Sequence, residues 1–147
     1  MAGTSIAHQS LVMWAIRKMQ ADGFIPMAYD GNIPQFDCER RLSYPPNLGS
    51  LRPDAIAFSP AMGIFAFGEA KTEDDLDSDH TRQQFRRYAA IAFDSFLSRS
   101  AIYVATPRSA EMALDRLLRD VGLIGTRHVR RLHIPDCLIE ERTSAHA

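Results

Sequence analysis

The sequence has few of the residues that build covalent or metal-thiolate scaffolds. Only two cysteines, Cys38 and Cys137, occur among its 147 residues, and they do not form a C-x-x-C pair. This spacing argues against a zinc site and against a disulfide-rich framework. We expect both residues to be free, buried thiols, because unpaired cysteine behaves as a small hydrophobic residue.

Long apolar segments are missing as well. Charged residues interrupt the hydrophobic runs, so the sequence predicts no transmembrane helix. The first residues lack the charged start and the apolar core that are typical of a secretion signal. We therefore expect a soluble, cytoplasmic protein. No repeat or linker divides the sequence, which predicts a single domain over residues 1–147.

Three common catalytic motifs are absent: the G-x-S-x-G nucleophile elbow, the Walker loop and the H-E-x-x-H zinc motif. The net charge of −1 does not indicate a nucleic-acid-binding protein, although clustering of Lys and Arg matters more than their sum. One basic run does occur near the C-terminus, and it contains Arg127, His128, Arg130, Arg131 and His133. We interpret this run as an ordinary solvated surface.

The hydrophobic pattern predicts alternating helices and strands. A first helix should begin at a Thr4 or Ser5 cap and end at Asp22-Gly23. The other expected elements are extended segments in 24–41, strands at 51–58 and 63–71, a helix at 79–97 capped by Asp79, a strand at 101–106, a helix at 109–121 and a strand at 129–134. The acidic run at 73–79 reads as a solvated loop. This order predicts an α/β fold with a mixed central sheet flanked by helices.

The two strands around residue 60 are expected to form a hairpin with two different faces. Side chains alternate between the faces of a strand, and a four-residue loop at 60–63 would fix the pairing. The pairs expected on one face are Phe58 with Phe65, Ile56 with Phe67, and Asp54 with Glu69. The other face carries small residues such as Ala66 and Gly68, which favours a closely packed helix.

The expected pairing brings the carboxylates of Asp54 and Glu69 to the same end of the hairpin. Two like charges directly opposite one another destabilise a sheet, so a cation should lie between them. Lys71 could supply it, but a divalent ion is the better candidate because Mg²⁺ prefers oxygen ligands. The backbone carbonyl of Ala70 would be a third metal ligand. Lys71 would then stabilise charge that develops during a reaction, or orient the attacking water.

These residues match a known pattern. Arg52-Pro53-Asp54, followed after fourteen residues by Glu69-Ala70-Lys71, resembles the signature of the PD-(D/E)XK nuclease superfamily. The resemblance implies a restriction endonuclease-like core, with the two acids as metal ligands and Lys71 as the catalytic lysine.

A second match lies on the helix that follows. Gln84-Phe85-Arg86-Arg87-Tyr88 is similar to the Q-x-x-x-Y motif of RecB-type exonucleases. The resemblance implies that Gln84 helps to organise the site and that Tyr88 lies near it.

From these motifs we expect a Mg²⁺- or Mn²⁺-dependent deoxyribonuclease. Its cutting would be structure-specific or accessory to DNA repair, recombination or mobile elements, and a homodimer fits that role. The expected DNA contacts are Arg52, Arg86, Arg87 and Tyr88.

The first helix departs from the family pattern. Many members carry an acid there, but none occurs between Ser5 and Ala21. His8 or Gln9 could replace it, although we interpret His8 as a surface or packed histidine. The departure keeps an alternative open, a catalytically inactive nuclease-fold module that binds DNA or protein. A purely structural α/β domain is a second alternative.

Overall fold

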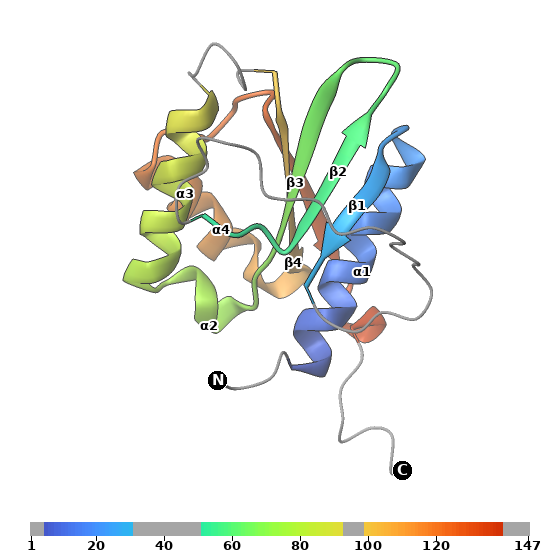
Figure 1. Cartoon of the computed structure of the whole chain (residues 1–147). Helices are drawn as coiled ribbons and strands as arrows, with labels where there is room; N and C mark the ends of the chain where they lie inside the picture. The colour runs from blue at the N-terminus through green and yellow to red at the C-terminus, as the bar shows by residue number, and fades with distance from the viewer. Residues whose placement is uncertain (1–4, 31–50, 93–98, 140–147) are drawn as a thin grey trace.

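A computed structural model describes residues 5–30, 51–92 and 99–139 of the chain (Figure 1). Its strands are β1 (Ile25–Tyr29), β2 (Ala55–Ser59), β3 (Ile64–Ala70), β4 (Ala101–Pro107) and β5 (Val129–Ile134). Its α-helices are α1 (Ile6–Ala21), α2 (Glu73–Leu76), α3 (Asp79–Ala92) and α4 (Glu111–Asp120). Two short 3-10 helices, η1 (Arg108–Ala110) and η2 (Asp136–Leu138), complete the described elements.

The protein is an α/β fold with a mixed sheet of five strands in the order β1-β2-β3-β4-β5. The pairs β1–β2 and β2–β3 are antiparallel, whereas the pairs β3–β4 and β4–β5 are parallel. Helix α1 covers one face, and α3 and α4 cover the other (Figure 1). The mixed sheet flanked by helices that the sequence predicts is confirmed.

Helix α1 begins and ends where its sequence indicates. The side-chain oxygen of Ser5 accepts a hydrogen bond from the amide of His8 at 3.0 Å, which caps the first turn. The chain leaves the helix at Asp22 and turns through Gly23, whose φ of 95° favours glycine. The buried side of α1 carries apolar residues such as Leu11, Ala15 and Met19.

The small face of the hairpin lies directly beneath α1. Ala66, Gly68 and Ala70 point into this layer, and a Cβ atom added to Gly68 would lie 2.9 Å from Met19 Cε and 3.2 Å from Ala55 Cβ. Helix and sheet therefore touch with almost no space between them. The expectation of a closely packed helix on this face is confirmed.

The second core lies between the sheet and α3, α4. Large side chains fill it, in contrast to the small residues beneath α1, and its fully buried members include Phe67, Phe85, Tyr88, Leu114 and Leu117.

Among the described helices, none combines the length and the apolar character that crossing a bilayer requires.

Three predicted element boundaries are wrong. The strand expected from residue 51 begins at Ala55, because Pro53 has no N–H group to donate to a sheet ladder. The first part of the acidic run, Glu73–Leu76, forms α2 instead of a loop, and the amide and hydroxyl of Thr72 donate to Asp75 Oδ2 at 3.4 and 3.0 Å. Helix α3 is capped by Ser78 rather than Asp79, since Ser78 Oγ accepts from the Thr81 amide at 3.1 Å.

The other predicted strands are present, and some of the other predictions fall partly outside the described residues. The strand expected at 63–71 is confirmed as β3, and the strands expected at 101–106 and 129–134 are confirmed as β4 and β5. The helix expected at 79–97 is present as far as Ala92, and residues 93–97 lie outside the described part. Cys137 is exposed, which corrects the expectation of a buried thiol, and Cys38 lies outside the described residues.

The close contact at Gly68 gives a stability prediction. Replacing Gly68 with Ala puts a methyl group within 3.2 Å of Ala55 Cβ, and neither strand can move far inside a paired sheet. We expect G68A to lower the free energy of unfolding by about 1–3 kcal/mol, the usual cost of overpacking a core. Chemical denaturation measures the change. An unchanged free energy of unfolding would show that the space between α1 and the sheet accommodates the added methyl group.

Candidate active site

The hairpin has the register that the sequence predicts. Phe58 pairs with Phe65, and Ile56 pairs with Phe67. The amide of Asp54 donates to the carbonyl of Gly68 at 2.9 Å, which continues the ladder one residue before β2 begins. Asp54 therefore lies beside Glu69 at the end of the hairpin farthest from the turn.

Glu69 is the only Asp or Glu with a fully buried side chain among the described residues. Its Oε2 atom accepts a hydrogen bond of 2.5 Å from the Tyr88 hydroxyl. Its Oε1 atom lies 3.8 Å from Lys71 Nζ, and the carboxyl group is also within hydrogen-bonding reach of the Asp54 side chain. Burial, with the nearby charge of Asp54, raises the pKa of Glu69 well above its ordinary value, although Lys71 and Tyr88 oppose the shift.

Asp54 is held from two sides. Its Oδ2 atom accepts a 2.8 Å hydrogen bond from the amide of Ala70 and lies 3.2 Å from His8 Nε2. The N–H and C=O groups of one residue in a strand point to the same edge, so the carbonyl of Ala70 also faces the Asp54 side. Two carboxyl groups and one backbone carbonyl thus converge at this end of β3.

His8 corrects the interpretation made from the sequence. It is neither a surface residue nor one packed in the core, because its side chain reaches Asp54 from the first turn of α1. Burial lowers the pKa of His8, but the hydrogen bond and the charge of Asp54 outweigh that effect and raise it overall. The sequence offered His8 or Gln9 in place of the missing acid on the first helix, and the structure places His8 against Asp54.

Lys71 is the next residue after Glu69 on the same side of the chain, and its amine approaches the Glu69 carboxyl group. Its amide donates to the Ala105 carbonyl at 3.1 Å, so the β3–β4 ladder holds its backbone just beyond the end of β3. Its side chain is 12% exposed, which leaves the amine almost enclosed next to Glu69. The structure thus brings Asp54, Glu69 and Lys71 together, as the sequence predicts.

The residues of the Q-x-x-x-Y motif face the sheet from α3. Gln84 and Tyr88 lie one helical turn apart, and the buried Oε1 atom of Gln84 has no hydrogen-bond partner in the part of the chain that the structure describes. Tyr88 is fully buried and bonded to Glu69. This placement corrects the expectation that Tyr88 contacts DNA, because its hydroxyl supports the carboxyl group instead.

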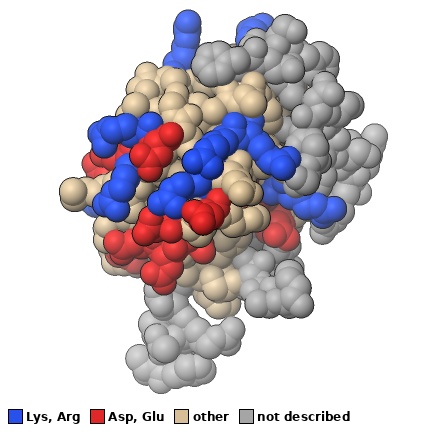
Figure 2. All heavy atoms as spheres, turned by 90° about the vertical axis from the view of Figure 1, so that its left-hand side faces the viewer, with Lys and Arg blue, Asp and Glu red and all other residues tan. Residues whose placement is uncertain are grey.

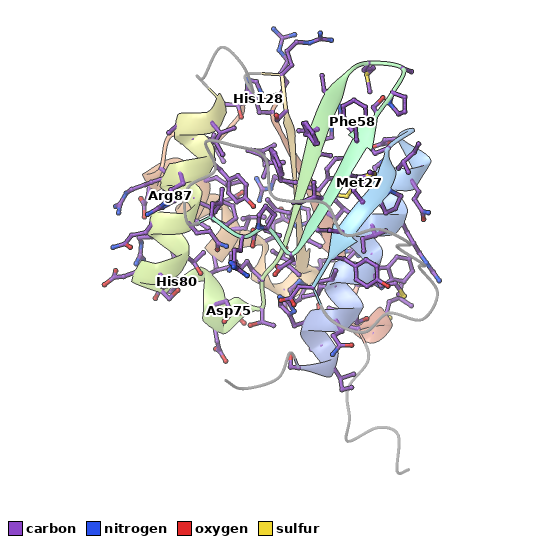
Figure 3. All side chains as sticks on the ribbon, in the orientation of Figure 1. Met27, Phe58, Asp75, His80, Arg87 and His128 are labelled. Atoms are coloured by element: carbon purple, nitrogen blue, oxygen red, sulfur yellow. The ribbon has the colours of Figure 1, made fainter. Side chains whose placement is uncertain are left out.

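A pocket of about 370 Å³ lies next to this cluster, between α3 and the segment before β2. The residues that line it are Leu51, Arg52, His80, Gln83, Gln84 and Arg87. His80 and Arg87 lie along α3 in Figure 3. Arg86, the third arginine expected to contact DNA, is exposed and does not line the pocket. Figure 2 shows Lys and Arg side chains spread over the surrounding face, with acidic residues gathered below them.

Within the described ranges, no three His, Cys, Asp or Glu side chains are grouped so that they could hold a metal ion. A site of two carboxylates and one backbone carbonyl contains only two such side chains. Comparisons of the chain with family models, with curated proteins and with solved structures found no match.

The raised pKa of Glu69 predicts a pH-dependent stability. The folded protein binds the Glu69 proton more tightly than the unfolded chain does. Protonation of Glu69 therefore stabilises the folded state fully below pH 4.5, and this contribution is lost as the pH rises through the folded pKa. We expect metal-free E69Q to melt at a higher temperature than the wild type near pH 8. The difference should shrink toward pH 4, as calorimetry in EDTA can measure.

The exposed Glu111 on α4 provides the matched control. E111Q should melt close to the wild type at every pH. A difference between E69Q and the wild type that stays constant from about pH 4 to 8 would contradict the link between burial and titration.

Proposed function

We propose that the protein is a metal-dependent nuclease of the PD-(D/E)XK type that hydrolyses phosphodiester bonds in DNA. The observation that carries this proposal is the full burial of the Glu69 carboxyl group next to a second acid, Asp54, and within 3.8 Å of Lys71 Nζ. Burying one carboxyl group against another is costly, so proteins keep such pairs mainly where they act. The order of helices and strands also agrees with the restriction endonuclease-like core that the resemblance implies.

The residues at the site fit a hard divalent cation. Mg²⁺ takes oxygen ligands and retains several waters, so it needs few groups from the protein. Asp54, Glu69 and the carbonyl of Ala70 would hold it. A bound Mg²⁺ or Mn²⁺ would polarise a phosphodiester oxygen and lower the pKa of a coordinated water.

Other side chains would prepare the site. Lys71 would stabilise the negative charge that develops on the phosphate, because its amine is nearly enclosed and close to the carboxyl pair. Tyr88 and His8 are positioning residues, since each holds one carboxyl group through a hydrogen bond. Gln84 would support the site with its side-chain oxygen, for which the described residues supply no hydrogen-bond partner.

The pocket beside the site suits a DNA backbone. Arg52 and Arg87 line it from opposite walls, and guanidinium groups bind phosphate oxygens through paired hydrogen bonds. Because contacts to a phosphate backbone carry no sequence information, we propose structure-specific or accessory cutting. Homodimerisation stays a prediction.

One observation favours a second candidate, an inactive nuclease-fold module that binds DNA or protein. His8 lies 3.2 Å from Asp54, and Lys71 lies 3.8 Å from Glu69, so the protein itself supplies a basic group to each carboxyl. Such pairs could stabilise the cluster without a metal. Metal-dependent cleavage separates the two candidates.

The proposed activity can be tested on supercoiled plasmid DNA. We expect nicking in Mg²⁺ or Mn²⁺ that EDTA stops. K71A should lower the rate by about 100-fold or more, the usual loss when a group that stabilises developing charge is removed. Densitometry of the relaxed band after electrophoresis measures the rate.

The control for this experiment is Lys18, which pairs with Asp22 in the last turn of α1. K18A removes the same charge far from the proposed site and should nick DNA at the wild-type rate. Cleavage by K71A at that rate would refute the assignment. Absence of both cleavage and metal binding in the wild type would favour the inactive module.

The pocket gives a separate binding prediction. R87A should weaken binding of a duplex oligonucleotide in EDTA and lower the slope of log K against log salt by about 1, because one phosphate contact is lost. R86A removes the neighbouring exposed arginine, which does not line the pocket, and should change the slope less. Fluorescence polarisation at several salt concentrations measures both. Equal slopes for the two variants would show that the pocket does not hold the DNA.

A further inference from the structure

A second basic pocket lies at the opposite end of the sheet. Its volume is about 480 Å³, and four of the residues that line it are basic: Arg99, Arg127, His128 and Arg130. We call it the strand-start pocket, because these residues lie at or near the starts of β4 and β5. Figure 3 shows His128 at the end of the molecule opposite Asp75.

The parallel pairing of β4 and β5 creates this cluster. Parallel strands begin at the same edge of a sheet, so the segments that lead into them meet there. The amide of Ile102 donates to the His128 carbonyl at 2.7 Å, which aligns the first residues of both strands. Residues that are nearly thirty positions apart in the sequence therefore face one hollow.

The structure divides the basic run near the C-terminus into separate roles. Arg131 turns to α4 and forms an ion pair of 2.5 Å with Asp115. Arg130 is fixed by Tyr103, whose hydroxyl accepts from it at 2.6 Å, and by Asp22 at 3.3 Å. Arg127 and His128 line the strand-start pocket, so the run is not one uniform solvated face.

Two of the charges in this pocket are not balanced by an ion pair among the described residues, unlike that of Arg130. Arg99 and Arg127 are exposed, and neither has an ion-pair partner in the described part of the chain. No Asp or Glu occurs among the described residues that line the pocket. Converging like charges repel one another, so an anionic ligand would relieve an unfavourable arrangement.

Two fixed groups shape the pocket for a ligand with several oxygen atoms. Arg130 is held in place before any ligand arrives, which lowers the entropy cost of binding. His128 Nδ1 lies 3.3 Å from the Ser100 carbonyl, so Nε2 is the ring nitrogen left for a ligand. Guanidinium groups suit the tetrahedral oxygens of phosphate.

We propose that the strand-start pocket binds a phosphate group, either in a nucleic-acid backbone or in a free nucleotide. Its volume lies within the range of sites for small ligands, and its basic lining matches a phosphate. Ala101 pairs with Ala66, three residues before Glu69, so this site lies at least about 10 Å along the strands from the carboxyl pair. The inference therefore does not depend on the proposed nuclease activity.

The test uses the full chain in EDTA, where no metal-dependent cleavage can occur. The variant is R99A/R127A, and the matched control R116A/R119A removes two exposed arginines from α4. The probes are a fluorescein-labelled single-stranded 15-mer, dAMP and inorganic phosphate, used at about 50 mM salt where phosphate contacts are strong. Polarisation gives the Kd of the 15-mer, and thermal shifts report the two small probes.

We expect R99A/R127A to raise the Kd of the 15-mer at least about tenfold, whereas the control changes it little. This result assigns the pocket to a nucleic-acid backbone. If the Kd is unchanged but dAMP or phosphate raises the melting temperature of the wild type and not of R99A/R127A, the ligand is a free phosphate compound. The proposal is overturned if R99A/R127A and the control behave alike with all three probes. If R99A/R127A melts at a much lower temperature than the wild type, the single variant R127Q is used in its place.

Discussion

The burial of one carboxyl group, that of Glu69, constrains the arrangement around it. Transferring a charged carboxylate into an apolar core costs several kcal/mol unless partners compensate for lost hydration. The Tyr88 hydroxyl supplies one partner from α3, and Lys71 approaches the other oxygen from the end of β3. Helix α3 is thereby tied to the strand at the point where the apolar core becomes polar. The same constraint gives the site its chemistry, since neighbouring Asp54 makes a full negative charge on Glu69 still less favourable.

Local patterns in the sequence were sufficient to predict the hairpin and its register. Alternation of side chains along two adjacent strands placed Phe58 opposite Phe65 and brought Asp54 beside Glu69, because a short loop leaves few pairings. The ends of α1 were equally predictable, since a serine cap and a glycine in the left-handed region mark them. In each case the determining interactions lie within a few residues or across one turn.

What the sequence did not predict depends on contacts between distant segments. His8 and Asp54 are 46 residues apart, and only the packing of α1 on the sheet brings them together. Tyr88 looked like a surface ligand until the position of α3 showed it to be buried beneath the site. The strand-start pocket is a further example, because it exists only once β4 and β5 lie side by side. The late start of β2 is a local exception, since Pro53 was visible in the sequence and its effect was underestimated.

Gly68 acts as a spacer between the two layers, and its effect reaches beyond the atoms it touches. Without a Cβ, it lets α1 lie close to the sheet, next to Ala15 and Met19. His8 belongs to the same helix and lies about 10 Å from Ala15 toward its N-terminus, at 1.5 Å per residue. A tilt of α1 about its contact with Gly68 would move the His8 imidazole toward or away from the carboxyl group of Asp54. The absence of one methyl group in the sheet therefore helps to set the position of the His8 ring relative to Asp54 at the same end of the hairpin.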